Sequence, residues 1–476
     1  MTKYIVALLF TLLAGTQHVW AQHAPASTAR LQSLNELSEP TSPQASPKIT
    51  AWKLKQNTKV LFVENHALPM IDVKVSFAAG SQQDGDSPGI AAMMLSLFNE
   101  GTALRDATAL ATGFDRLGVE QHNDIDREQS YLNLRSLSTP DVLQPALQLF
   151  TEMLAQPGIS ADAIRRVKSE LITQLQLEQD APKSHALTLI YNELYPDQPI
   201  AHSMYGSVDS LERIDEAQLR AFYRRAYTAT NAQIVIVGDL TAEQAQTLSQ
   251  ALADALPSGP ALALPQLLAG PKASGKTLHV ENDSTQSLLV LAQAALPNQH
   301  PDALTTRVGH LIFSLMLNAQ LREKHSVTYG VLSNVSHAQG LTPWVIDLNT
   351  PSQYSLSSMA YIKARFAQFL EQGPTDKALE EVKQYVMRAQ PQYTVSNKSM
   401  LEEISLMSRF NQPLDFTYKA QQIEKLTSAQ VKAAMQRHYS AQGWVSVTAG
   451  PNAEQLPLPV TMAPEVLAEH SCRANL

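Results

Sequence analysis

Apolar runs in the early part of the chain predict two strands and a long helix. The strands cover 60–63 and 71–79, and the turn residues of 65–69 between them favour pairing of the two. Over 160–179, apolar residues recur on one helical face, and Ser160 stands where an N-cap is expected. This part of the chain therefore mixes strands and helices.

The later part of the chain shows the same mixture. An apolar run over 288–295 predicts a strand. Helices are predicted over 358–371 and over 375–388, where Thr375 is the expected N-cap of the second. Because strands and helices do not alternate in the regular order of a parallel sheet, the pattern favours an α+β fold.

Two stretches of the chain resemble each other at a constant spacing. Residues 211–238 and 423–450 each predict a capped helix, a short loop and an apolar strand that ends at glycine. At an offset of 212 positions, nine pairs are identical: Glu212/Glu424, Ala217/Ala429, Gln218/Gln430, Ala221/Ala433, Arg225/Arg437, Tyr227/Tyr439, Ala229/Ala441, Val235/Val447 and Gly238/Gly450. Ordered matches of this kind predict a tandem duplication.

A second match indicates the extent of the two copies. Val-Glu-Asn stands before an apolar strand both at 63–65 and at 280–282. The sequence therefore predicts an N-terminal half at 48–262 and a C-terminal half at 275–451. Between them, residues 263–274 are rich in Pro, Gly and Ala and predict a linker.

The ends of the chain predict export and two peripheral segments. Lys3 and the apolar run after it have the length of a signal peptide, so we expect residues 1–21 to direct export to the periplasm. Residues 22–47 predict an N-terminal arm, and 452–476 predict a tail. The single cysteine, Cys472, lies in that tail, so the core rather than a disulfide must hold the fold together.

Composition excludes two classes of function. The net charge of −8 is modest, and no basic patch with interleaved aromatic residues suggests nucleic-acid binding. A chain with one cysteine cannot form a zinc site of the finger type. Of the thirteen histidines, no two lie three to five positions apart on a predicted helix.

Residues 61–102 resemble the opening of a half in the pitrilysin/insulinase zinc peptidase superfamily. There, two strands lead through an A-G-S turn, here 79–81, to a helix that begins at a glycine, here Gly89, and ends in a G-T turn, here 101–102. The resemblance continues in order along the chain and includes 371–386. It implies two homologous halves, each a mostly antiparallel sheet packed against helices, as in mitochondrial-processing-peptidase-like members.

The helix at this place lacks the residues that bind zinc in the peptidases. Catalytic members carry H-x-x-E-H there: two histidines bind Zn²⁺, and the glutamate activates the bound water. Counted from the ends of the helix, the histidine positions fall on Ala92 and Ser96 and the glutamate on Leu95. The third ligand, a carboxylate from a later helix, falls on Gln174. The resemblance thus implies a chain that binds no cofactor itself.

A zinc site in this chain stays a less favoured alternative. A slip of one position places Thr173 at the third-ligand position, and a shift of one full turn places Glu170 there, but one carboxylate cannot hold zinc alone. His122, His185 and His202 belong to the same half. Their simpler interpretation is that they are ordinary surface or hydrogen-bonded histidines.

Residues 321–331, LREKHSVTYGV, resemble the L-R-E-x-x-G-x-x-Y segment of the family. In catalytic assemblies its Arg and Tyr, here Arg322 and Tyr329, reach across to the zinc site and hold the substrate backbone. Two departures are Ser326, where the family has glycine, and Phe-Ser-Leu-Met at 313–316, where a glycine-rich loop is expected. The alternative is structural: Arg322 caps its helix and Tyr329 packs in a strand.

The resemblance also implies a partner. Members of this length assemble as dimers around a chamber, and in heterodimeric members one chain holds zinc while the other supplies the Arg and Tyr. We therefore expect a non-catalytic subunit that pairs with a zinc-bearing sister subunit and acts on short or unfolded peptides. The main alternative is a catalytically dead homodimer that binds peptides or scaffolds an envelope complex. An autonomous zinc metallopeptidase is the third possibility.

Overall fold

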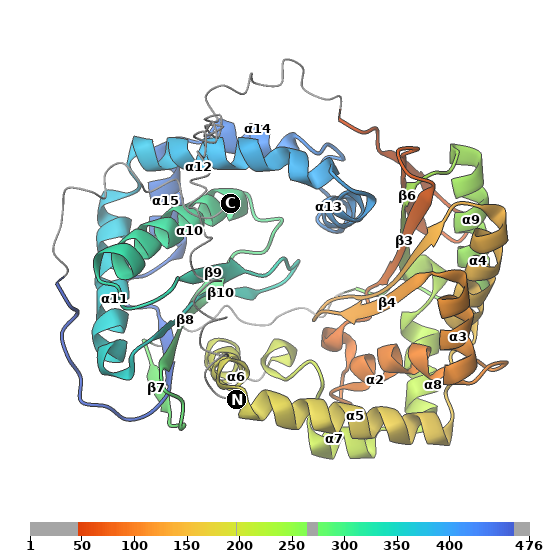
Figure 1. The fold of residues 1–476 in the computed structure, drawn as a ribbon, viewed down its shortest axis with the longest axis horizontal. Helices are drawn as coiled ribbons and strands as arrows, with labels where there is room; N and C mark the ends of the chain where they lie inside the picture. The colour runs from red at the N-terminus through yellow and green to blue at the C-terminus, as the bar shows by residue number, and fades with distance from the viewer. Residues whose placement is uncertain (1–45, 197, 264–274, 461–476) are drawn as a thin grey trace, which may run out of the picture. The chain divides into compact units, whose positions relative to one another are not determined.

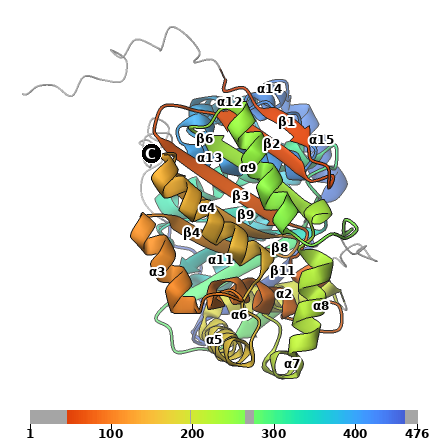
Figure 2. The same cartoon turned by 90° about the vertical axis from the view of Figure 1, so that its right-hand side faces the viewer.

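The computed structural model describes residues 46–196, 198–263 and 275–460. The expected signal peptide, all but the last two residues of the arm, nearly all of the linker and Cys472 lie outside these described residues. Contacts divide the chain after Ala45, and the description below concerns the unit that begins at the next residue. Figure 1 and Figure 2 show its strands and helices in two views.

A six-stranded sheet forms the centre of the N-terminal half. In spatial order its strands are β1 (Thr50–Lys53), β2 (Lys59–Glu64), β6 (Ala232–Gly238), β3 (Met70–Phe77), β5 (Ser130–Leu137) and β4 (Glu120–Ile125). β2 and β6 run parallel, and the other neighbours run antiparallel.

The two strands expected near the start exist as β2 and β3, but their expected pairing is wrong. β6 lies between them and bonds to both. Its side chains are buried on both faces, Ile234 and Ile236 in one apolar cluster and Val235 and Val237 in another. A strand that is apolar on both faces belongs in the interior of a sheet, which explains why it separates the two.

A five-stranded sheet forms the centre of the C-terminal half. In spatial order its strands are β7 (Thr277–Val280), β11 (Val445–Ala449), β8 (Ser287–Ala295), β10 (Thr342–Thr350) and β9 (Leu332–Val335). β7 and β11 run parallel and the others antiparallel. This order repeats that of β2, β6, β3, β5 and β4, while the exact boundaries of the two halves stay predictions.

Helices pack on both mixed sheets, so the fold is α+β. Those of the N-terminal half are α2 (Ile90–Leu97), α3 (Ala107–Leu117), α4 (Pro140–Ala155), α5 (Ala161–Asp180), α6 (Pro182–Leu194), α7 (Val208–Arg213), α8 (Glu216–Ala226) and α9 (Ala242–Ala255). α4 contacts β5 and α9 contacts β2 and β6, and Figure 2 shows both helices across that sheet. None of the described helices has the length and hydropathy needed to cross a bilayer.

The helices of the C-terminal half include those that the sequence predicted over 358–371, over 375–388 and within 423–450. They are α10 (Ala303–Leu317), α11 (Ser355–Gln372), α12 (Asp376–Ala389), α13 (Asn397–Arg409), α14 (Tyr418–Glu424) and α15 (Ser428–His438). α11 and α12 confirm the helices expected over 358–371 and 375–388, and α5 confirms the one over 160–179. Thr375 accepts a hydrogen bond from the third amide of its helix, as an N-cap should.

The two repeated helices, α8 and α15, begin with the same hydrogen-bonded motif. Asp215 accepts from the backbone N–H of Gln218 at 2.8 Å, and the Gln218 side chain accepts from the backbone N–H of Asp215 at 2.9 Å. Thr427 and Gln430 form the same reciprocal pair at the start of α15. This capping box gives a physical reason why glutamine stands at both positions of the repeat.

Each half supplies one helix to the sheet of the other half. α6 contacts β8 and β11, and α13 contacts β3 and β6. One apolar cluster joins α6 to the second sheet and contains Ala186, Ile190, Leu194, Val290, Ala292 and Val447. Another joins α13 to the first sheet and contains Leu401, Ile404, Met407, Leu61, Val235 and Val237. Neither sheet is therefore covered by its own half alone.

A buried ion cluster fixes the end of α13 against the loop between β4 and β5. Arg409 is bound to Asp126 at 2.6 Å and to Glu128 at 2.6 Å. The carboxylate of Glu128, which is 2% exposed, also accepts from the backbone N–H groups of Gln339 and Gly340 at 2.9 and 2.8 Å. Asp126 has a pKa below its usual value: burial raises it, but the charge and hydrogen bonds of Arg409 outweigh that effect.

Replacing Ile190 or Ile404 by alanine tests the exchange of helices. Both side chains are fully buried, so each change should lower the free energy of unfolding by about 2–5 kcal/mol. Urea denaturation should keep a single transition with a lower midpoint, because each helix unfolds with both halves. Val395→Ala is the matched control, since Val395 is 77% exposed and should change stability by less than about 0.5 kcal/mol. Two separate transitions, of which only one moves, would contradict this interpretation.

Candidate functional site

α2 is the helix in which the resemblance predicts the zinc-binding positions. It begins after Gly89, where the resemblance predicts the start of the helix, and the φ of Gly89, +94°, lies in the left-handed region. Ala92 and Leu95 are 3% and 6% exposed and belong to the main apolar cluster, and Ser96 is partly buried. Methyl, isobutyl and hydroxymethyl groups thus stand at the positions where the resemblance predicts imidazole and carboxylate groups in catalytic members.

The position of the third ligand does not restore the site. Gln174 lies on α5, which packs against α2, and its exposed side chain lies 3.5 Å from Glu178. Glu170, His185 and His202 are exposed, and within the described residues no metal-binding group of His, Cys, Asp and Glu involves α2 or α5. The side chains present at this place therefore do not fit a zinc ion.

Asp84 binds the N-terminus of α2, a contact that no local sequence pattern predicted. Its carboxylate accepts from the backbone N–H groups of Gly89 at 2.7 Å and Ala91 at 3.0 Å. Burial raises the pKa of Asp84 to about 7, because loss of hydration outweighs these two bonds and the charge of Arg225. An acidic residue ahead of a helix is a signal for a cap, but Asp84 lies five positions before Gly89, outside the usual N-cap position.

The pH dependence of the free energy of unfolding should report the raised pKa of Asp84. Its pKa is about 7 in the folded state, against an ordinary value of 3.8, so between these values the folded state binds a proton that the unfolded chain does not. This contribution is present below about pH 4 and is lost as the pH rises through 7. Asp84→Asn cannot titrate, so urea denaturation between pH 5 and 7 should show a smaller fall in stability than in the unchanged protein. Equal slopes in both proteins would refute the raised pKa.

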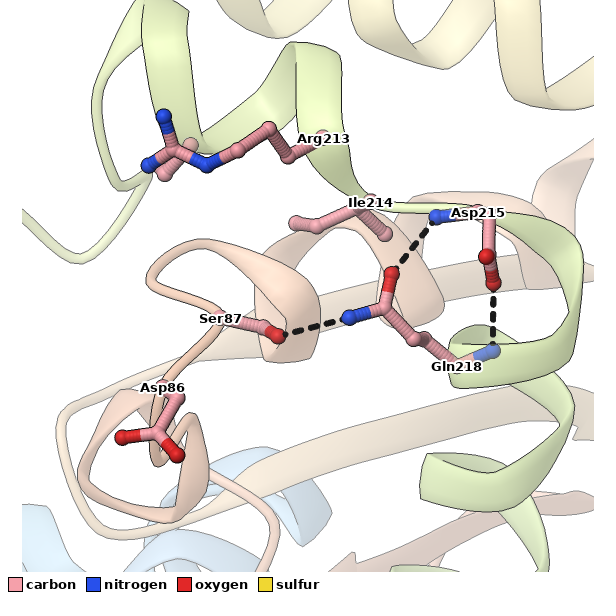
Figure 3. A pocket seen from close by; sticks show the side chains of 7 residues that line it. Asp86, Ser87, Arg213, Ile214, Asp215 and Gln218 are labelled. Carbon is pink, nitrogen blue, oxygen red and sulfur yellow. Dashed lines mark hydrogen bonds between the residues drawn. The ribbon is translucent and has the colours of Figure 1, made fainter.

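A polar pocket of about 450 Å³ lies between the loop before α2 and the helices α7 and α8 (Figure 3). It is lined by Asp86, Ser87, Ser210, Arg213, Ile214, Asp215 and Gln218. The Gln218 amide lies within it and donates to the Ser87 hydroxyl at 3.1 Å. Residues 85–89 have the letters G-x-S-x-G, but none of the lining residues is a histidine. The pocket therefore lacks the base that a serine nucleophile requires.

A second short pattern also lacks the structure that its chemistry needs. Residues 270–277, GPKASGKT, have the letters of a phosphate-binding loop. That loop lies between a strand and a helix, whereas Thr277 here begins strand β7. Lys276 forms an ion pair with Glu193, and residues 270–274 lie outside the described part of the chain. We assign no phosphate site to this segment.

A larger polar pocket, of about 540 Å³, is formed by both halves of the chain. Strands β3, β4 and β5 line one side and α13 the other, through Asp72, Val73, Lys74, Glu120, His122, Asp124, Tyr131, Asn133, Leu134, Arg135, Lys398, Leu401 and Glu402. Lys74 pairs with Glu402 at 2.7 Å across the two halves, and Arg135 pairs with Asp72 at 2.8 Å. This mixture of charges and hydrogen-bonding groups suits a polar ligand such as a peptide backbone.

Arg322 and Tyr329 are both exposed, next to a change in helical winding. α10 continues as a π-helical turn over Asn318–Lys324, which carries Arg322, and such turns are frequent at functional sites. Tyr329 is 91% exposed, so it does not pack as a core side chain. The glycine-rich loop expected near 313–316 is instead part of the continuous helix α10.

The segment that carries both residues is held in place by hydrogen bonds and by buried apolar side chains. The side-chain amide of Asn318 donates to the backbone oxygen of Val331 at 2.9 Å and accepts from its N–H at 2.8 Å. Leu321 and Val327 are buried, at 0% and 2% exposed. Ser326, which stands where the family has glycine, has a φ of +54°, a conformation that favours glycine. A fixed segment thus presents Arg322 and Tyr329 to solvent.

Replacement of Ser326 by glycine should stabilise the protein. A left-handed conformation costs a residue with a side chain roughly 1–2 kcal/mol, and part of this gain is offset by the greater freedom of glycine in the unfolded chain. We expect Ser326→Gly to raise the free energy of unfolding by about 0.5–1 kcal/mol and Ser326→Val to lower it by more. Urea denaturation measures both. A loss of stability in Ser326→Gly would show that the serine side chain matters more than the backbone conformation.

Comparison with known families gives two matches along the chain. Residues 59–208 match the model described as insulinase (peptidase family M16). Residues 213–386 match the model described as peptidase M16 inactive domain. The first match includes α2, and the second includes Arg322 and Tyr329.

Curated relatives include proteins with and without a peptidase designation. A protein of Helicobacter pylori named non-peptidase homolog YmxG is 24% identical over 453 residues, which are 92% of this chain and 96% of the relative. A protein of Rickettsia bellii named uncharacterized zinc protease is 20% identical over 409 residues, 84% of this chain and 97% of the relative.

Solved structures resemble the described fold. The peptidase M16 inactive domain of Pseudomonas fluorescens is 35% identical, with a TM-score of 0.81, and the match covers 87% of this chain and all of that one. The periplasmic protease PqqL of Escherichia coli is 15% identical, with a TM-score of 0.72, over 90% of this chain and 50% of PqqL. The second likeness concerns the fold alone.

Proposed function

Because the chain belongs to peptidase family M16, the insulinase family, we propose that it is a non-catalytic subunit that completes a peptide-degrading chamber with a zinc-bearing sister subunit. One observation carries this proposal: the place of the zinc site holds Ala92, Leu95 and Ser96, while Arg322 and Tyr329 are presented to solvent. The H. pylori relative, itself named a non-peptidase homolog, supports the absence of catalysis in this chain alone.

The paired sheets support a duplicated architecture for this subunit. The two sheets have the same strand order, and α8 and α15 start with the same capping box. These likenesses support two homologous halves of the metallohydrolase type, with the zinc position in the first and the Arg/Tyr segment in the second. A partner arranged in the same way would hold its zinc on its own equivalent of α2.

The chemistry of the exposed pair fits a role on the sister's substrate. A guanidinium such as that of Arg322 can donate two parallel hydrogen bonds to backbone carbonyl or carboxylate oxygens of a peptide. A phenol such as that of Tyr329 can donate one to the oxyanion that develops when zinc-bound water attacks. Zinc itself would supply that water and polarise the scissile carbonyl. In this assignment the substrates are peptides whose backbone is accessible.

The proposed location is the periplasm. The basic and apolar start of the sequence supports export, and the E. coli relative in the structural comparison is named a periplasmic protease. A chamber in that compartment would receive peptides released from exported proteins.

A second candidate function is a homodimeric peptide-binding or scaffold protein of the envelope. The pocket between β3, β4, β5 and α13 favours it, because that pocket is complete within one chain and contains paired charges and hydrogen-bonding groups. This function would require no zinc-bearing partner.

Peptidase activity of mixed subunits distinguishes the candidates. The candidate sister is a chain, such as one encoded in an adjacent reading frame, that carries an intact H-x-x-E-H helix. A quenched fluorescent peptide, with zinc supplied, should be cleaved by the mixture and not by this chain alone. Tyr329→Phe should lower kcat of the mixture by about 10²-fold, the usual loss when one oxyanion donor is removed. Arg322→Ala should raise KM, because it removes a contact to the substrate backbone.

Tyr385→Phe is the matched control. Tyr385 on α12 is also an exposed tyrosine, at 59%, and its hydroxyl has no role in the proposal, so activity should not change. If the sister alone is fully active and the mixture is no faster, complementation fails and the binding protein is favoured. Cleavage by this chain alone would instead establish an autonomous metallopeptidase.

A further inference from the structure

A cluster of potential metal ligands lies in the C-terminal half, away from α2. Among the described residues, one group of three offers ligand atoms within 4.8 Å of one another: His300, Asp302 and His438. His300 and Asp302 lie at the start of α10, and His438 is the last residue of α15. The two imidazole rings meet edge to face with their centres 5.0 Å apart, and all three residues are partly buried.

The ligand types in this cluster suit a transition metal. Two imidazole nitrogens and one carboxylate oxygen form a set that Zn²⁺ and neighbouring divalent ions accept, whereas Mg²⁺ and Ca²⁺ prefer oxygen ligands alone. Three protein ligands leave further coordination positions for water. We propose that His300, Asp302 and His438 bind a divalent transition metal that links the start of α10 to the end of α15.

The present hydrogen bonds of Asp302 show what a metal would displace. One carboxylate oxygen accepts from His438 Nε2 at 2.8 Å and pairs with Arg437 at 2.5 Å. His300 Nδ1 accepts from the backbone N–H of Asp302 at 3.1 Å. The carboxylate thus already attracts two cationic or proton-donating groups to one point. A metal ion would replace the proton of His438 and compete with the guanidinium of Arg437 for the same oxygen.

The cluster is specific to the second half of the chain. At the offset of the repeat, the position of His438 corresponds to Ala226, which is fully buried and offers no ligand atom. α10 and α15 pack against each other, so a metal at this point would join two helices already in contact. Its effect would be to stabilise the C-terminal half, independently of the peptidase role proposed above.

Zinc titration of the full-length protein tests the proposal. Isothermal titration with ZnCl₂ should detect one high-affinity site, and Zn²⁺ but not Mg²⁺ should raise Tm. His300→Ala and His438→Ala should each weaken Zn²⁺ binding by about 100-fold and abolish the rise in Tm. His185→Ala is the matched control: His185 is exposed and outside the cluster, so its removal should leave binding unchanged.

Arg437→Gln separates a metal site from a set of ordinary ion pairs. Removal of the competing guanidinium should tighten Zn²⁺ binding severalfold while the protein without zinc becomes no more stable. Absence of Zn²⁺ binding, binding that survives both histidine substitutions, or weaker binding in Arg437→Gln would each overturn the proposal. Peptidase activity of the mixture with the sister should be the same for His438→Ala, so failure of this site leaves the proposed function untouched.

Discussion

The exchange of α6 and α13 between the two halves is the constraint on which the rest of this structure depends. Each helix buries its apolar face on the sheet of the other half, so burial of either sheet requires both halves. Seating α13 also brings Arg409 to Asp126, which is partly buried, and to Glu128, whose buried charge would otherwise be strongly unfavourable. The larger polar pocket follows from the same contact, because α13 forms one of its walls. The apolar packing of α13 thus determines where the Arg409 ion cluster and the larger polar pocket lie.

Local patterns in the sequence predicted elements but not their neighbours. Ser160 and Thr375 mark the starts of α5 and α12 because capping is a contact within one turn of the chain. The partners of β2 and β3 depend on β6, which lies more than 150 positions later, and no local pattern encodes that contact. For the same reason the sequence did not predict the exchange of helices or the Arg409 cluster. Periodicity predicts which face of a helix is buried, but it does not predict which element that face packs against.

The residues of the candidate site also fall into two groups: those that a local motif predicted and those that only the fold brings together. The resemblance to the peptidase family could assign Ala92, Leu95 and Ser96 as predicted degenerate zinc positions, because that motif is short and continuous. It also singled out Arg322 and Tyr329, whose predicted role on substrate stays a prediction. Asp302 and His438 meet from positions 136 residues apart, and Asp84 caps α2 from outside the usual N-cap position. Contacts between residues so far apart in the sequence, or outside a usual cap position, can be recognised only from the folded structure.

The energetics of the two family sites differ in a way that bears on function. At α2, two of the three predicted ligand positions hold the apolar residues Ala92 and Leu95, and a buried apolar side chain stabilises a core where an unpaired polar one would not. At the Arg322 segment the structure does the opposite: it places Ser326 in a left-handed conformation, ends α10 in a π-helical turn and leaves Tyr329 in water. None of these features stabilises the isolated chain. Contact with another molecule at this segment, of the kind that the proposed complementing subunit would make, would offset the cost of these features.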